Sequence, residues 1–232
     1  TADANALSVA EHAMMLMLTI ARQVQTYDAN TRAFKWSSVE APVTWDLSGM
    51  TLLVVGFGRI GGRVARLAAA FGMDVVVHDP HVAMNTVKGA GFRYAKTMAE
   101  GLAQADWVTI HCPSNAENRG MVDAEFLASM KPGARLVNTA RGTLVQEAAL
   151  AAALRTGHIA AAGLDVFWDE PLAKDNPLLD APNVVMTPHT AAATVQGMRR
   201  MGLSCADSII RHFKGEVDVD MVINKEVLRS NR

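Results

Sequence analysis

Short apolar runs alternate with helical patterns along most of the chain. The runs are continuous rather than alternating, and they are shorter than an ordinary helix, which is typical of strands buried on both faces. They predict strands at 51–55, 74–78, 107–111, 135–138, 159–164 and 183–186. Apolar positions at helical spacing predict helices at 59–71, 97–104, 123–130, 146–155 and 191–213. This alternation predicts an α/β fold, a doubly wound parallel sheet with helices on both faces.

The first apolar segment predicts a helix that is buried on several sides. Ser8 is followed three residues later by Glu11, which is the spacing of a capping box, so we expect the helix to begin there. Its apolar residues lie nearly all around the helix as far as about Arg22. Thr97 and Glu100 form a second capping box at the start of a later helix.

The segment 23–45 is polar and irregular, and it contains Trp36 and Trp45. A loop of this length without structure of its own usually has a function. Two interpretations are open: the two rings belong to an arm that packs on a partner subunit, or they cover this chain's own core. Together with the preceding helix, the first interpretation predicts a homodimer.

Composition and charge narrow the kind of partner. Half of the 232 residues are hydrophobic, and the net charge is −1 with Lys and Arg scattered along the chain. We therefore expect neither nucleic acid nor a membrane as a partner. Cys112 and Cys205 stand in no metal-ligand spacing, and no basic region precedes the first apolar run. We predict no metal site, no signal peptide and a cytoplasmic protein.

A glycine motif joins the first predicted strand to the helix that follows. Gly56, Gly58 and Gly61 have the spacing G-x-G-x-x-G, which permits a tight turn, a close approach to a pyrophosphate and close helix packing. Asp79 ends the second strand, near the position at which an acid binds a ribose 2′-hydroxyl. The alternative is a glycine-rich turn beside a solvated carboxylate. Since Asp79 would repel a 2′-phosphate and no arginine adjoins it, the motif favours NAD over NADP as the cofactor.

Three ionisable residues follow the later strands, at the edge of the sheet where ligands bind in such folds. Hydride transfer to a carbonyl needs a proton donor, a cation for an anionic substrate, and a carboxylate that keeps the donor protonated and oriented. His189, Arg141 and Glu170 fit these roles. Taken singly, each has a structural alternative: a core histidine, a loop cation and a turn residue. Their joint placement beside a dinucleotide motif favours catalysis.

Six motifs, in their order, resemble the D-isomer-specific 2-hydroxyacid dehydrogenases, the family of the phosphoglycerate, glyoxylate/hydroxypyruvate and formate dehydrogenases. The matching stretches are Ser8-Val9-Ala10-Glu11-His12, Gly56-Phe57-Gly58-Arg59-Ile60-Gly61, His111-Cys112-Pro113, Val137-Asn138-Thr139-Ala140-Arg141-Gly142, Leu164-Asp165-Val166-Phe167 with Glu170-Pro171, and Thr187-Pro188-His189. The resemblance implies that Arg141 binds the substrate and that Glu170 and His189 supply the proton. It implies NAD contacts at Arg59, Ile60, Asp79, Cys112, Pro113, Thr139, Ala140, Asp165, Ala191 and Ala192.

The resemblance also bears on the substrate and on the organisation of the chain. Formate dehydrogenases of the family carry Gln where Glu170 stands, so Glu170 favours a small D-2-hydroxy or 2-keto acid, whose reaction moves a proton as well as a hydride. In the family a substrate lobe precedes the Ser8 helix, and almost no sequence precedes it here. We expect a hinge helix and dimerisation arm over 1–45, an NAD-binding Rossmann domain over 46–190, and a C-terminal helix and tail over 191–232 that return to the lobe.

Two other functions are open at this point. The resemblance extends to transcriptional corepressors that use this fold as a nucleotide-gated interaction module and keep the same three ionisable residues. A Rossmann-type binder without chemistry is the second alternative. Turnover of 2-keto acids with NADH separates both alternatives from the dehydrogenase.

Overall fold

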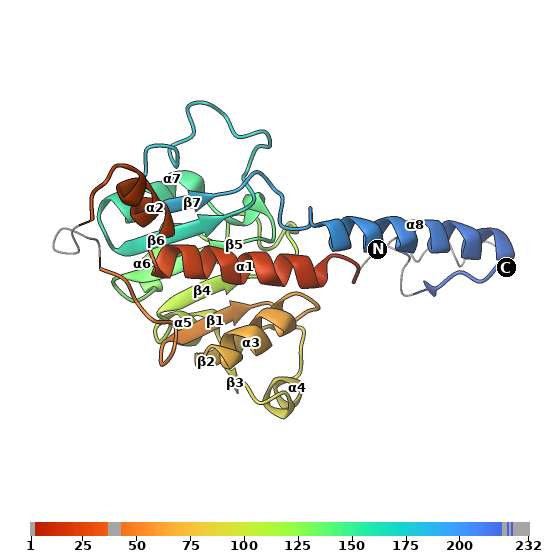
Figure 1. Ribbon diagram of the computed structural model, residues 1–232. Coiled ribbons are helices and arrows are strands. Elements are labelled where there is room, and N and C mark those ends of the chain that lie inside the picture. The colour runs from red at the N-terminus through yellow and green to blue at the C-terminus, as the bar shows by residue number, and fades with distance from the viewer. Residues whose placement is uncertain (1–2, 37–42, 220–221, 223, 225–232) are drawn as a thin grey trace.

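The computed structural model describes residues 3–36, 43–219, 222 and 224. Within them, seven parallel strands form one sheet in the order β3-β2-β1-β4-β5-β6-β7 (Figure 1). The strands are β1 (Thr51–Val55), β2 (Asp74–His78), β3 (Arg93–Tyr94), β4 (Trp107–Ile110), β5 (Ala134–Asn138), β6 (Ile159–Leu164) and β7 (Val184–Met186). The helices are α1 (Ala6–Ala21), α2 (Val24–Arg32), α3 (Gly61–Ala70), α4 (Met84–Gly89), α5 (Met98–Leu102), α6 (Ala124–Ser129), the 3₁₀ helix η1 (Gly142–Leu144), α7 (Glu147–Arg155) and α8 (Val195–Lys214).

Helices cover both faces of the sheet, which confirms the predicted doubly wound α/β fold. Along β1, Leu52 and Val54 pack against the layer of α1, α3 and α4. Leu53 and Val55 pack against the layer of α5, α6 and α7. Because successive side chains of a strand point to opposite faces, a strand that is covered on both must be apolar throughout. This is why the strands appear as continuous apolar runs.

The order of the strands reverses between β1 and β4. From β1 the chain proceeds outward to β2 and β3 and then returns to β4 on the other side of β1. Val55, the last residue of β1, lies beside Ile110, the last residue of β4. The segments that follow these two strands therefore diverge at one edge of the sheet, which is where ligands bind in open α/β sheets.

Helix α1 is buried on most of its sides, as its sequence predicts, and it lies along one face of the sheet (Figure 1). Leu16 and Met17 are fully buried in the layer between α1 and the sheet. The helix begins at Ala6, so the predicted cap at Ser8 is wrong. Ser8 lies inside the helix, and its Oγ contacts Thr194 Oγ1 at 2.9 Å instead of capping a backbone amide.

Three short elements, in addition to the 3₁₀ helix η1, are missing from the sequence prediction. Helix α2 falls within the segment expected to be irregular, and it buries none of its residues, so no apolar periodicity reveals it. Helix α4 and the two-residue strand β3 fill the connection between β2 and α5. The capping box of α5 is confirmed in part, because Thr97 Oγ1 accepts a hydrogen bond from the Glu100 amide, while Glu100 reaches back to the amide of Lys96.

The two tryptophans of the segment 23–45 lie in different surroundings. Trp45 is half-buried on its own chain, and its ring centroid lies 4.3 Å from the guanidinium carbon of Arg135. Trp36 is 84% exposed and follows Phe34, which is 94% exposed. The interpretation as a cover for the chain's own core therefore fits Trp45, whereas the ring of Trp36 is left largely uncovered by the residues that the structure describes. The remainder of the segment, 37–42, lies outside the described residues.

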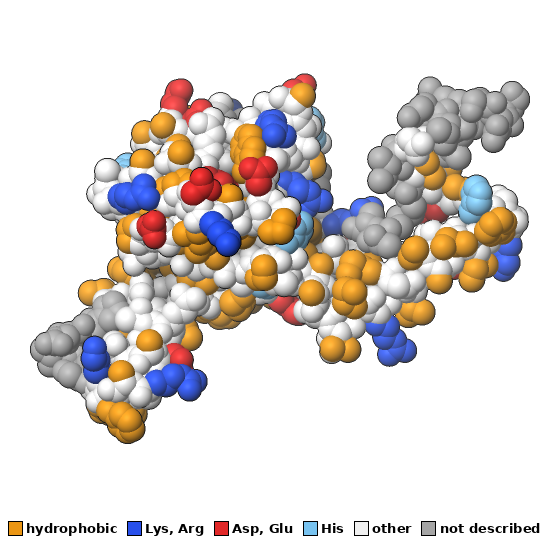
Figure 2. All heavy atoms as spheres, turned by 90° about the horizontal axis from the view of Figure 1, so that it is seen from above, with side chains coloured by type: hydrophobic (Ala, Val, Ile, Leu, Met, Phe, Trp, Pro, Cys, Tyr) orange, Lys and Arg blue, Asp and Glu red, His pale blue; other side chains and the backbone are white. Residues whose placement is uncertain are grey.

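Helix α8 extends away from the body of the molecule (Figure 1). Hydrophobic side chains line its exposed length (Figure 2), among them Val195 and Phe213, which are 83% and 84% exposed. At its start, Gly197 packs closely on α1, because a Cβ there would lie 2.9 Å from Ser8 Oγ. Among the described helices, none combines the length and the apolar character needed to cross a membrane.

Candidate active site

The glycine turn after β1 is shaped by two close backbone approaches. Gly56 has a φ of +95°, and a Cβ there would lie 2.7 Å from the backbone nitrogen of Cys112. A Cβ at Gly61 would lie 1.9 Å from the carbonyl oxygen of Gly56. At Gly58, by contrast, a Cβ would meet no atom of the described residues within 4 Å. The turn is therefore packed tightly on the protein side and open on the other, which is the shape that a pyrophosphate needs.

Asp79 follows β2 and lies beside this turn. Its carboxylate accepts hydrogen bonds from the amide of Phe57 at 2.7 Å and from the amide of His81 at 2.8 Å. The side chain thus holds the glycine turn against the end of β2. A hollow of about 360 Å³ opens here, and Gly56, Gly58 and Asp79 contribute to its wall.

A second hollow, of about 330 Å³, continues along the strand ends toward β6. The two hollows share His111, Cys112 and Pro113, so they form one trough across the strand ends. The second also takes in Thr139, whose hydroxyl is buried and lacks a hydrogen-bond partner in the part of the chain that the structure describes. An open glycine turn, an adjacent carboxylate and an unsatisfied hydroxyl fit a dinucleotide along this trough.

Two potentially reactive side chains in the shared wall are uncharged. Burial raises the pKa of the Cys112 thiol to about 11, with a further rise from the charge of Asp79. Burial lowers the pKa of His111 to about 3. Since a thiol is reactive only as the thiolate, Cys112 lines the trough without acting as a nucleophile. His111 is likewise neutral at physiological pH.

Glu170 and His189 form a hydrogen-bonded pair, and His189 lines the second hollow of the trough. His189 Nδ1 and Glu170 Oε2 are 2.6 Å apart, and the other Glu170 oxygen accepts from the amide of Phe167 at 3.0 Å. Partial burial raises the pKa of Glu170, but the bond to His189, the Phe167 amide and the charge of Arg141 outweigh it, so the net pKa is lowered. The carboxylate is therefore ionised at neutral pH and fixes one nitrogen of the ring, which leaves Nε2 for another partner.

The backbone around His189 is held by Asp165, which is fully buried at the end of β6. The carboxylate of Asp165 accepts from the amides of Thr190 and Ala191, each at 2.9 Å. Its carbonyl oxygen accepts from the amide of His189 at 2.7 Å. His189 has a φ of +54°, a left-handed conformation that is uncommon for a residue other than glycine. These bonds keep His189 in that conformation.

Arg141 follows β5 on the wall of the second hollow, which it shares with His189. Its loop is fixed by the buried Asn138, which accepts from the Ala140 amide and donates to the carbonyl oxygen of Arg141. The next residue, Gly142, touches the loop of Glu170, since a Cβ there would lie 1.9 Å from the carbonyl carbon of Phe167. Arg141 and Glu170 therefore stand on loops that are in backbone contact.

The structure brings most of the sequence-predicted site residues to this trough. Ile60, Thr139, Ala140, Asp165, Ala191 and Ala192 line the second hollow beside Arg141 and His189. Three predicted site residues do not line either hollow. Gly61 packs inside the turn, and Arg59 is exposed just before α3, where its carbonyl oxygen accepts from Arg63. Glu170 lines a separate hollow and reaches the trough only through its bond to His189. Asn138, Thr187 and His12 support the site without a role having been predicted for them, although all three fall within the motifs that carry the family resemblance.

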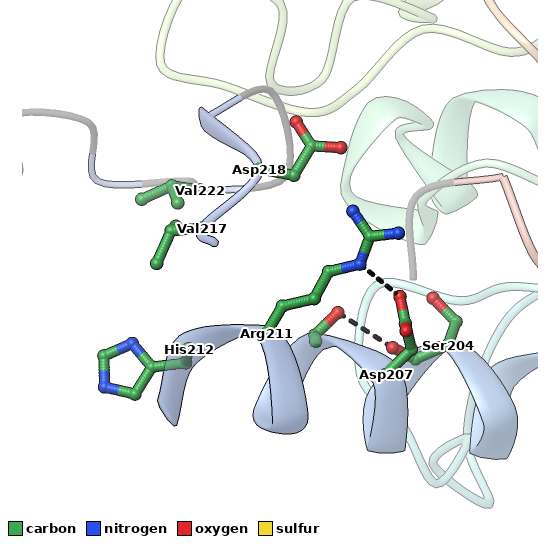
Figure 3. Close-up of a pocket in the computed structure, with 8 residues that line it drawn as sticks. Ser204, Asp207, Arg211, His212, Val217, Asp218 and Val222 are labelled. Carbon is green, nitrogen blue, oxygen red and sulfur yellow. Dashed lines mark hydrogen bonds and ion pairs between the residues drawn. The ribbon is translucent and has the colours of Figure 1, made fainter. Parts of the chain in front are cut away.

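Two of the hollows outside the trough are lined by ionisable side chains. One has a volume of about 580 Å³. Glu170 and His189 line it together with the apolar side chains of Leu172, Leu179 and Met186. The other, of about 340 Å³, lies along the last turns of α8 (Figure 3). It carries an exposed ion pair in which Arg211 donates to Asp207 at 2.8 Å. An exposed pair of this kind is an ordinary surface feature.

Fold and trough together define a Rossmann-type dinucleotide-binding domain. Residues 14–191 match the model of the NAD-binding domain of the D-isomer-specific 2-hydroxyacid dehydrogenases. The chain therefore belongs to this family, and NAD is the cofactor of its domain, as predicted.

Relatives and solved structures agree with this assignment. The D-3-phosphoglycerate dehydrogenase of Mycobacterium leprae is 43% identical over 229 residues, which cover 96% of this chain and 43% of the relative. That of Methanocaldococcus jannaschii is 39% identical, covering 95% of this chain and 42% of the relative. The D-lactate dehydrogenase of Aquifex aeolicus with NAD and lactic acid superposes with a TM-score of 0.84 at 32% identity, covering 92% of this chain and 68% of that one. The chain thus spans less than half the length of the two D-3-phosphoglycerate dehydrogenases.

Proposed function

We propose that this chain is the cofactor-binding and catalytic part of a D-2-hydroxyacid dehydrogenase. The observation that carries the proposal is the hydrogen-bonded Glu170–His189 pair, whose histidine lines the second hollow of the trough together with Arg141. Bound NAD would supply the hydride chemistry. The three side chains would supply what the cofactor does not: a positive charge that polarises the carbonyl, and a proton for its oxygen.

Each side chain has a distinct task in the reduction of a 2-keto acid. Arg141 binds the carboxylate and polarises the carbonyl oxygen with its planar set of donors. His189 gives a proton to that oxygen from Nε2, since Nδ1 is engaged by Glu170. Glu170 stabilises the protonated ring and fixes its orientation, because its carboxylate is ionised and anchored to the Phe167 amide. In the oxidative direction the ring takes the proton back.

The substrate class follows from the same three residues and from the relatives. An anionic substrate suits Arg141, and a reaction that moves a proton suits the Glu170–His189 pair. The names of the relatives make D-3-phosphoglycerate, D-lactate and glyoxylate the first substrates to test. Turnover of one of them with NAD(H) would support the dehydrogenase. NADH binding with no turnover, in a protein joined to a substrate lobe, would instead favour a nucleotide-gated binding module.

We expect Asp79 to set the choice between NADH and NADPH. Replacing it with Ser removes a negative charge where the adenosine ribose is proposed to lie, so the ratio of NADH to NADPH affinity should fall about tenfold or more. Fluorescence titration of both nucleotides measures this ratio. Asp74→Ser is the matched control, because Asp74 lies at the other end of β2 in an exposed ion pair with Arg93. An unchanged ratio in Asp79→Ser would show that the nucleotide lies elsewhere.

We also propose a homodimer in which the arm that follows α1 packs on a second copy. Phe34 and Trp36 are almost fully exposed, and exposed aromatic side chains are typical of interfaces. Light scattering at micromolar concentration should give twice the mass of the chain, and Trp36→Ser combined with Phe34→Ser should shift it toward the monomer. A monomer in the unmodified protein would refute the dimer.

We propose a cytoplasmic location for the protein, because both cysteines are free thiols.

A further inference from the structure

His12 connects the first helix to the loop that carries His189. It lies in the middle of α1, and its Nε2 is 2.9 Å from Thr187 Oγ1. Thr187 gives its only hydroxyl proton to Asp165 at 2.6 Å. The hydroxyl oxygen must therefore accept from His12, which requires a proton on Nε2 of the ring. The directions of the two hydrogen bonds that link His12 to Thr187 and Thr187 to Asp165 are therefore fixed.

Asp165 in turn binds the backbone around His189. Its carboxylate accepts from Thr187, from the Thr190 amide and from the Ala191 amide. A fully buried carboxylate needs several hydrogen-bond donors to offset its lost hydration, and a left-handed histidine needs its neighbours fixed. His12 Nε2 lies 3.4 Å from the same carboxylate oxygen, so the ring also supports Asp165 directly.

His12 itself is not placed to exchange protons with a substrate. Its side chain is 15% exposed, and it does not line the trough in the part of the chain that the structure describes. Burial lowers its pKa, with the charge of Asp165 acting in the opposite direction. The neutral ring is then a fixed donor between α1 and the loop.

We propose that His12 is a positioning residue, which acts through Thr187 and Asp165 to hold the loop of His189 in its left-handed conformation. The importance of this loop for the reaction rests on the proposed function, but the hold itself does not. It can be measured as the protection of the Thr190 and Ala191 amides, whether or not the protein turns over a substrate.

Three variants of the 232-residue chain test the proposal by hydrogen exchange followed by NMR. His12→Leu removes the donor and should speed exchange at Thr190 and Ala191 by about tenfold, the equivalent of one hydrogen bond. His12→Gln keeps an amide donor near the place of Nε2 and should restore the slow exchange. His158→Leu is the control, because it removes another half-buried ring, bonded to the Leu127 carbonyl far along the chain. NADH affinity should follow the same order, since Ala191 and Ala192 line the trough.

The outcomes are distinct. Fast exchange confined to the loop in His12→Leu, with rescue by Gln, supports the proposal. Equal exchange in His12→Leu and His158→Leu, or a Gln variant that behaves like Leu, overturns it. If the loop responds as expected but no 2-keto acid is ever reduced, the hold stands and the proposed dehydrogenase fails.

Discussion

Joined to a substrate lobe, these 232 residues should reduce 2-keto acids at least about a thousandfold faster than they do alone. In the structure the side chains of His189 and Glu170 are 50% and 36% exposed, so water competes for the site. Arg141 and His189 line the same hollow, and the exposure of the histidine shows that this hollow is open to solvent. A closing lobe excludes water and fixes the substrate between two walls, and both effects accelerate the reaction.

The measurement is steady-state reduction of the 2-keto acid panel by the chain alone and by a fusion to the lobe of a phosphoglycerate dehydrogenase relative. NADH affinity serves as the control and should agree within about threefold, because the glycine turn and Asp79 belong to this chain. Similar rates from the two proteins would mean that the substrate lies within the 232 residues and that its site has been misplaced.

Replacing His189 with Asn should lower the reduction rate of the fused protein by about 10²- to 10⁴-fold, the usual contribution of a general acid. The Asn amide can still reach Glu170, so the pair is kept while the proton donor is lost. NADH affinity should change little, and His158→Asn should leave the rate unchanged. A His189→Asn variant that keeps most of its activity would remove His189 from the mechanism.

The partner of His189 can be tested in the same assay through the pH profile. Because the pKa of Glu170 is lowered, its carboxylate keeps its negative charge at all pH values near neutrality. Glu170→Gln removes this charge, and the reduction rate should then decline at a lower pH on the alkaline side. An unchanged alkaline limb would separate Glu170 from proton transfer.

The apolar pattern predicts most of the fold, because each strand of a sheet that is covered on both faces is a continuous apolar run in the sequence. It does not reveal α2, which buries no side chain, or β3, which has only two residues. The cap at Ser8 fails for a related reason. A local motif competed with a contact to Thr194, 186 residues further along the chain, and local spacing carries no information about such a contact.

The strand-end rule places Arg141, Glu170 and His189 at one edge of the sheet before any coordinates are known, and the structure puts them there. What the sequence does not predict is how they are held. The inward hydrogen bonds of Asp165, which fix the left-handed backbone of His189, join segments that lie 25 and 26 residues apart in the sequence. Trp45 shows the same limit, since Arg135, its neighbour in space, is 90 residues away in the sequence.

The contact between Gly142 and the backbone of Phe167 limits how this site can diversify. Since a Cβ at Gly142 would lie 1.9 Å from the carbonyl carbon of Phe167, any side chain there would displace the loop that anchors Glu170 relative to Arg141. Their spacing cannot be widened for a bulkier substrate by ordinary point mutation without disturbing both loops. We therefore expect changes in substrate range to arise from residues outside this contact, while the positions of Arg141 and Glu170 are kept.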